Sequence, residues 1–102
     1  MSVEIGSFIV RTPGTVGGRP RIAGTRVTVR SIAICYKQGL SPEEIALQYE
    51  HLTVAQVYAA LTYYHANQAE IEADIAAEEE LYNKLADENK QANQPASLNK
   101  LA

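Results

Sequence analysis

The sequence predicts a mainly α-helical protein: a three-helix, helix-turn-helix-like (homeodomain-like) core preceded by a short N-terminal β hairpin and followed by an acidic helix. Three observations support this. Glycine- and proline-rich turns separate short β-type runs over residues 1–30. Three apolar helical patterns follow, each beginning after a serine or threonine. An acidic segment with a narrow apolar stripe comes last. We therefore expect a core over 1–66, an acidic amphipathic helix over 67–90 and a flexible tail over 91–102.

The N-terminal segment is predicted to be extended. Ser7–Arg11 is a short β-type run that a Pro-Gly pair ends. Further along, the dipeptide Ala23-Gly24 fits a hairpin turn between residues 21–22 and 25–29, with Gly24 at positive φ. A single hairpin is only marginally stable in water, so we expect these strands to pair with a second copy of the chain.

The sequence predicts an N-cap residue for each of the three core helices. These are Thr28, Ser41 and Thr53, and the last two can form capping boxes with Glu44 and Gln56. We expect the first helix to end at Gly39, the second near Tyr49 and the third near residue 66. The predicted buried positions are Val29, Ile32, Ala33 and Tyr36 in the first helix, and Val54, Val57, Tyr58, Leu61 and Tyr64 in the third.

A fourth helix is expected from Gln68 to about Glu88. The residues from Asn67 to Glu70 resemble another capping box, so we place a break near residues 66–67. The alternative is one continuous helix from Val54. Eight acids and one lysine lie between Glu70 and Glu88. The apolar stripe on this acidic helix consists of Ile71, Ile75, Tyr82 and Leu85.

Composition places the chain among globular proteins that bind other macromolecules. Six basic residues and no acid lie between Ile5 and Pro42, whereas eleven acids and three lysines lie between Glu43 and Ala102. Two oppositely charged surfaces suggest two different partners, although they could also be ordinary solvated faces. A single cysteine, the lack of a signal peptide and the lack of a membrane-length apolar run indicate a cytoplasmic protein.

The candidate DNA-binding residues are four arginines and one glutamine, namely Arg19, Arg21, Arg26, Arg30 and Gln56. Arginine can form bidentate hydrogen bonds with phosphate or guanine. However, no lysine or arginine occurs between Gln38 and Asn83, so the third helix has little with which to contact DNA. The same arginines could instead serve dimer pairing or solubility.

The sequence contains no pattern that predicts catalysis, a metal site or a cofactor. The glycines between Gly14 and Gly24 lack the Gly-Lys-Ser/Thr ending of a phosphate-binding loop, and turn geometry explains them. Neither His51 nor His65 has a partner at metal-ligand spacing. Cys35 lies among apolar residues, which favours a buried structural thiol. We therefore expect a protein that is not an enzyme and that has no small-molecule substrate.

Two motifs resemble a known family. The stretch Gly17-Gly-Arg-Pro-Arg-Ile-Ala-Gly-Thr-Arg26, followed by Gly39-Leu-Ser-Pro-Glu-Glu-Ile45, resembles the bacterial domain-of-unknown-function family numbered four hundred and thirty-three over roughly residues 7–66. Members of that family are similar to VapB-type antitoxins, which are often paired with a PIN-like ribonuclease toxin. The resemblance implies a helix-turn-helix core with an N-terminal strand segment.

Two functions remain open on this basis. The first is an antitoxin-like dimer that binds a nuclease-like toxin through the acidic helix, with Ile71, Ile75, Tyr82 and Leu85 as anchors, and that could also contact operator DNA through the arginines. The second is a homodimeric adaptor or structural protein that binds protein only. Salt-dependent binding of duplex DNA would distinguish them.

Overall fold

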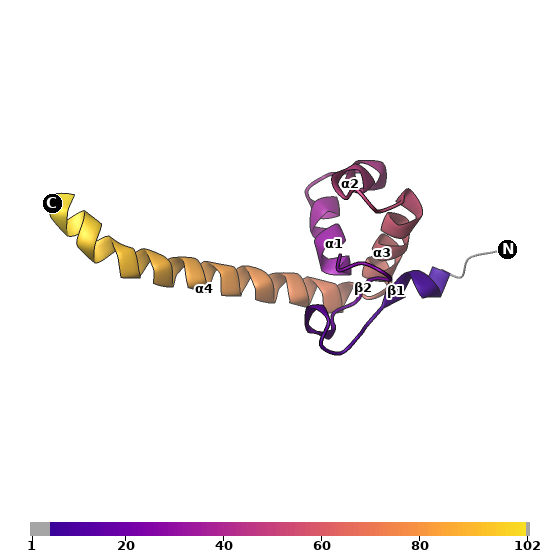
Figure 1. Ribbon diagram of the computed structural model, residues 1–102, viewed down its shortest axis with the longest axis horizontal. Coiled ribbons are helices and arrows are strands. Elements are labelled where there is room, and N and C mark those ends of the chain that lie inside the picture. The colour runs from indigo at the N-terminus through magenta and orange to yellow at the C-terminus, as the bar shows by residue number, and fades with distance from the viewer. Residues whose placement is uncertain (1–4, 102) are drawn as a thin grey trace. The chain divides into compact units, whose positions relative to one another are not determined.

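The structure is a computed structural model that describes residues 5–101. The chain divides into two compact units, residues 1–72 and 73–102. The first unit contains every strand and the first three α-helices, and the second consists of α4 residues (Figure 1). The elements in order are η1 (Ile5–Phe8), β1 (Ile9–Val10), η2 (Val16–Gly18), β2 (Arg21–Ile22), α1 (Val29–Lys37), α2 (Pro42–Gln48), α3 (Val54–Ala66) and α4 (Gln68–Leu101).

A small antiparallel sheet forms within the N-terminal segment. Strand β1 pairs with β2, with Ile9 opposite Ile22. The predicted turn follows β2: Gly24 has a φ of +80°, and the Ile22 amide donates to the carbonyl oxygen of Val27 at 2.9 Å. Residue Arg21 also bridges to Thr28. Thus β2 pairs with β1 of the same chain, and pairing of these strands with a second copy stays a prediction.

The predicted helix starts are confirmed by cap hydrogen bonds. Ser41 Oγ accepts from the Glu44 amide at 3.1 Å, and the Glu44 carboxylate accepts from the Ser41 amide at 2.8 Å. Thr53 and Gln56 form the same reciprocal pair in front of α3. Thr28 caps α1 by accepting from the Ser31 amide. These local bonds satisfy backbone N–H groups that a helix start otherwise leaves unpaired.

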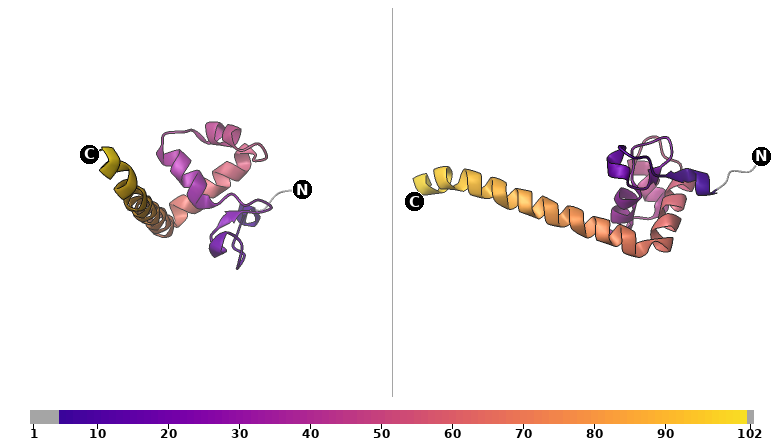
Figure 2. Two further views of the ribbon diagram at one scale, coloured as in Figure 1. Left: turned by 60° about the vertical axis from the view of Figure 1, so that its left-hand side comes forward. Right: turned by 90° about the horizontal axis from the view of Figure 1, so that it is seen from below.

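The core of the first unit lies between the three short helices and the N-terminal segment (Figure 2). Its fully buried side chains include Ile22, Ile32, Ile45 and Val57. On α3 the buried set differs from the prediction. Val54 and Tyr58 are partly exposed, whereas Ala59 and Ala60 are buried. The reason is that η1, β1 and β2 also pack against α3, so this helix is covered on more than one side.

The break between α3 and α4 is confirmed at Asn67, whose φ of −132° and ψ of 41° are not helical. The helix that follows continues to Leu101, whereas the sequence predicts an end near Glu88 and a flexible tail over 91–102. Seven of residues 91–101 are alanine, glutamine, leucine or lysine, which have high helix propensity, although Pro95 costs about 3 kcal/mol inside a helix. The first turn of α4 belongs to the first unit, which extends to Glu72 rather than to residue 66.

Candidate interaction surfaces

The four candidate arginines lie in different environments. Arg19, Arg21 and Arg30 are half-buried, and only Arg26 is exposed. Arg19 folds back onto its own turn, where a guanidinium nitrogen donates to the Val16 carbonyl oxygen at 3.3 Å. Val16 itself has a φ of 44° and is followed by two glycines at positive φ, so this turn is left-handed. The structure therefore does not present the four arginines as one exposed cluster.

Arg21 connects two turns of the N-terminal segment. One guanidinium nitrogen donates to the Thr25 carbonyl oxygen at 2.8 Å, and the other donates to Thr12 Oγ1 at 2.9 Å. A guanidinium can make several such bonds at fixed angles, which suits it to fasten separate pieces of backbone. Arg21 therefore has a structural role that the sequence pattern did not reveal, because its partners are set by the turns.

The candidate residue on α3 also has a structural role. The side-chain oxygen of Gln56 accepts from the Thr53 amide at 2.7 Å, and Gln56 is half-buried. This capping bond uses the acceptor that a bidentate contact with adenine would need. The capping box was predicted from the sequence. That it engages the Gln56 side-chain oxygen, which a contact with adenine would need, was not predicted.

A pocket of about 350 Å³ lies between the hairpin turn and the turn that joins α2 to α3. Thr25 and Val27, the neighbours of exposed Arg26, line one side of it, and His51 lines another. The imidazole Nε2 of His51 lies 3.9 Å from a Glu50 carboxylate oxygen, and both side chains are exposed. The structure thus brings the hairpin turn, through Thr25 and Val27, close to the turn between α2 and α3.

Two clusters, each of a cation, a tyrosine and a glutamate, fix the first turn of α4. Arg11 donates to both Glu70 and the Tyr63 hydroxyl, and the Tyr63 hydroxyl donates to Glu70. In the second cluster, Lys37 Nζ lies 2.6 Å from Glu72 Oε1, and the Tyr64 hydroxyl donates to the other Glu72 oxygen. The hydrogen bond to Glu70 raises the pKa of Arg11, and the bond to Glu72 raises the pKa of Tyr64.

Glu72 is expected to make stability depend on pH on the acid side. Hydrogen bonds from Lys37 and then from Tyr64 lower its pKa below the ordinary value of about 4.5. A carboxyl group whose pKa is lower in the folded state stabilises the fold above its unfolded pKa, and this contribution is lost as the pH falls through the folded value. We therefore expect Glu72→Gln to weaken the acid-side dependence of the melting temperature, measured by circular dichroism from about pH 7 to about pH 3.

Glu79→Gln is the matched control for this measurement, because Glu79 is an exposed glutamate later on α4. The control should keep the wild-type profile. Identical profiles for wild type and Glu72→Gln would contradict the stabilising role of the Glu72 cluster.

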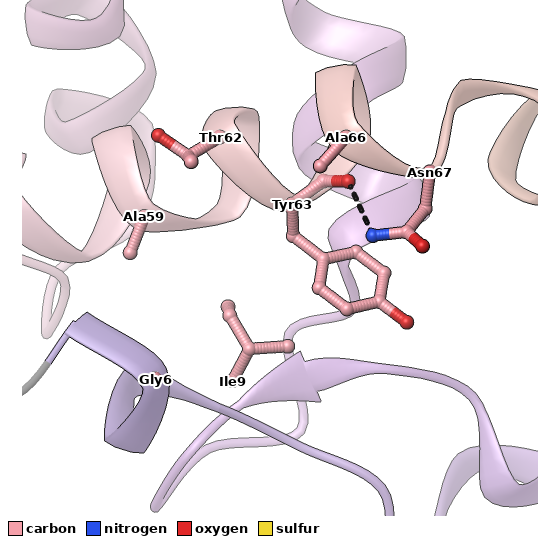
Figure 3. A pocket seen from close by; sticks show the side chains of 7 residues that line it. All are labelled: Gly6, Ile9, Ala59, Thr62, Tyr63, Ala66 and Asn67. Carbon is pink, nitrogen blue, oxygen red and sulfur yellow. Dashed lines mark hydrogen bonds between the residues drawn. The ribbon is translucent and has the colours of Figure 1, made fainter.

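An apolar pocket of about 320 Å³ lies between the N-terminal segment and α3 (Figure 3). Ile9 points from β1 toward Ala59 and Tyr63 of α3. The side-chain amide of Asn67 closes one end by donating to the Tyr63 carbonyl oxygen at 3.1 Å. The residues that line this pocket include no carboxylate, imidazole, thiol or amine, and its polar side chains are those of Thr62, Tyr63 and Asn67.

The predicted stripe on α4 is only partly exposed. Ile71 and Ile75 are buried, whereas Tyr82 is 72% exposed and Leu85 is 51% exposed. Leu81 is also exposed, at 57%, and was missed by the sequence analysis. Its i, i+4 spacing from Leu85 is the signal that could have identified it. The exposed apolar residues of the second unit therefore form a group defined by Leu81, Tyr82 and Leu85, which we call the α4 apolar surface.

Other expectations concern metals, membranes and the cysteine. Within residues 5–101, the structure shows no group of three or more His, Cys, Asp or Glu side chains that could hold a metal ion. No helix in this described range has the length and apolar character needed to cross a membrane. Cys35 is half-buried, and the pKa of Tyr49 is raised first by burial and then by the Cys35 thiol.

The fold is that of a small helix-turn-helix-like protein with a long acidic helix, and its sequence places it in a family. Residues 9–64 match the family described as "Protein of unknown function (DUF433)". The crystal structure of a DUF433 member protein from Anabaena variabilis ATCC 29413 is 36% identical, has a TM-score of 0.65 and covers 69% of each chain. The chain therefore belongs to the DUF433 family, as its motifs indicated. No match was found among curated proteins.

Proposed function

We propose that this protein is the antitoxin-like component of a bacterial toxin–antitoxin pair, that it acts as a dimer, and that it binds a PIN-like nuclease toxin through α4. The observation that carries the proposal is the α4 apolar surface, which is exposed on a strongly acidic helix. The resemblance to VapB-type antitoxins that the sequence motifs suggest is the second reason for the proposal.

The chemistry of α4 fits a nuclease partner. Eight acids and one lysine lie between Glu70 and Glu88, so like charges repel one another along the helix. A cationic groove would relieve this repulsion, and a ribonuclease needs cationic side chains where the RNA phosphates bind. In such a groove Leu81, Tyr82 and Leu85 would supply the apolar anchors of a helical ligand.

Operator binding is a secondary part of this proposal. If the protein contacts DNA, we assign the contact to the arginine-bearing N-terminal segment, chiefly to exposed Arg26, and not to α3. Dimerisation would double the number of arginines available.

The alternative function is a homodimeric adaptor or structural protein that does not bind DNA. Two observations favour it. Gln56 is engaged in a capping bond, and Arg21 is engaged with two turns, so two of the five candidate DNA-binding residues have structural roles.

Replacing Leu81, Tyr82 and Leu85 together with alanine is expected to weaken binding of the proposed PIN-like nuclease partner by about a hundredfold or more, because buried aromatic and aliphatic anchors dominate such interfaces. Isothermal titration calorimetry with the purified nuclease measures the dissociation constant of each variant. Asn83→Ala, an exposed change on the same helix, is the matched control and should bind normally.

Two outcomes would count against the proposal in different ways. If the triple variant binds like wild type, the nuclease contacts another surface. If wild-type protein does not bind the nuclease at all, the antitoxin-like function is wrong and the adaptor alternative is favoured. Circular dichroism of the variant should match that of wild type, since all three side chains are exposed.

A further inference from the structure

We propose that the outer face of α2 and α3 is a docking surface for a protein whose own surface is cationic and apolar. We define this α2–α3 face by Glu43, Leu47, Val54 and Tyr58. In DNA-binding helix-turn-helix proteins the second helix of the motif enters the major groove, so this is the face that such proteins direct at DNA. Here its chemistry suits a different class of partner.

Glu43 and Leu47 lie on α2, and Val54 and Tyr58 lie on α3, the next helix along the chain (Figures 1 and 2). The Tyr58 hydroxyl on α3 donates to a Glu43 carboxylate oxygen on α2 at 3.1 Å, and this bond raises the pKa of Tyr58. Leu47 follows Glu43 by one helical turn, and Val54 precedes Tyr58 by one turn, so each lies on the same side of its helix as its neighbour. The Tyr58–Glu43 hydrogen bond is the point at which the two rows meet.

This face exposes three large apolar side chains. Leu47 is 85% exposed, Tyr58 is 48% exposed and Val54 is 37% exposed. Single exposed apolar residues are common on proteins, but a large aliphatic residue, a valine and a tyrosine on adjoining helices are typical of an interaction site. The Tyr58–Glu43 bond holds the tyrosine ring in place, which reduces the entropy lost on binding.

The charge of the face identifies the kind of partner. Glu43, Glu44 and Glu50 are exposed on or beside it, and no lysine or arginine occurs between Gln38 and Asn83. Nucleic-acid binding depends on cationic side chains that neutralise phosphates, so this face would repel DNA. Two copies of the face would also repel each other. A cationic protein surface with an aliphatic pocket complements both the acids and the apolar residues.

This inference does not depend on the proposed function, because the α2–α3 face and the α4 apolar surface share no residues. The test uses the full chain labelled with ¹⁵N and followed by NMR. The probe is a short amphipathic helical peptide made of leucine and lysine, and the comparison ligand is a short duplex DNA. We expect the peptide to shift the amide signals of Leu47, Val54 and Tyr58, and we expect the DNA to leave them in place.

Variants distinguish this face from the acidic helix, which also attracts a cationic peptide. Leu47→Ala should weaken the binding measured at the α2–α3 amides by about tenfold, since it removes one exposed aliphatic anchor. Asn83→Ala, an exposed change outside both surfaces, is the matched control and should leave that binding unchanged.

Three outcomes would overturn the inference. Peptide-induced shifts confined to residues 73–88 would show that only the charge of α4 attracts the probe. Shifts of the Leu47 and Tyr58 amide signals on addition of DNA would show that this face binds DNA. Shifts of the same amides when the protein alone is concentrated, with sedimentation equilibrium above the 11.2 kDa of one chain, would make a second copy the occupant.

Discussion

Ile32→Ala is expected to lower the free energy of unfolding of the chain by about 2–5 kcal/mol, the range seen when buried isoleucine or leucine is truncated. Ile32 is fully buried on α1, which packs against α3. The substitution removes apolar contacts and leaves a cavity that neighbouring helices can fill only in part. Urea denaturation followed by circular dichroism measures the change.

Leu47→Ala is the control for this experiment, because the Leu47 side chain is mostly exposed. Its effect on the free energy of unfolding should stay within about 0.5 kcal/mol. If Ile32→Ala lowers the free energy of unfolding as little as Leu47→Ala does, the placement of α1 in the core is contradicted.

The second large effect is expected from Arg21→Ala, compared with Arg26→Ala. Arg21 donates to the Thr25 carbonyl oxygen and to Thr12 Oγ1, so its removal should cost about 2 kcal/mol of unfolding free energy, discounted for partial exposure. Arg26 is exposed, and its removal should cost less than about 0.5 kcal/mol. Equal losses in the two variants would contradict the structural role of Arg21.

The same pair of variants clarifies any DNA binding. If Arg26 contacts a phosphate, Arg26→Ala should reduce the slope of log affinity against log salt by about 0.9 while stability is kept. Arg21→Ala would then weaken DNA binding only to the extent that it unfolds the N-terminal segment. If Arg26→Ala leaves the slope of log affinity against log salt unchanged, the phosphate contact is not made by Arg26.

The helix starts could be read from the sequence because each depends on residues three positions apart. Ser41 with Glu44 and Thr53 with Gln56 form the expected boxes. Gly24 and Gly39 both have positive φ, at the turn and the helix end where they were expected. In each case the cause is local, so the sequence pattern is enough.

The distribution of side chains between core and surface was harder to predict, because it depends on contacts between distant residues. Tyr58 fits the apolar spacing of α3, yet the N-terminal segment covers Ala59 instead and leaves Tyr58 partly exposed. Ile71 was assigned to a partner-binding stripe but is buried. The two arginine interactions that tie Arg11 to Glu70 and Arg21 to Thr12 join residues whose proximity no local pattern encodes.

The anchored first turn of α4 has a consequence for how the rest of that helix forms. Helix nucleation is unfavourable because several backbone dihedral angles must be fixed before the first hydrogen bond is gained. Ile71 is buried, Glu70 pairs with Arg11, and Glu72 pairs with Lys37. These contacts with the folded core fix the first turn of α4 in helical form. Residues 73–88 then need only propagate a helix that has already started. The same residues cut away as a peptide would have to nucleate alone against their own charge repulsion and would remain largely a random coil in water.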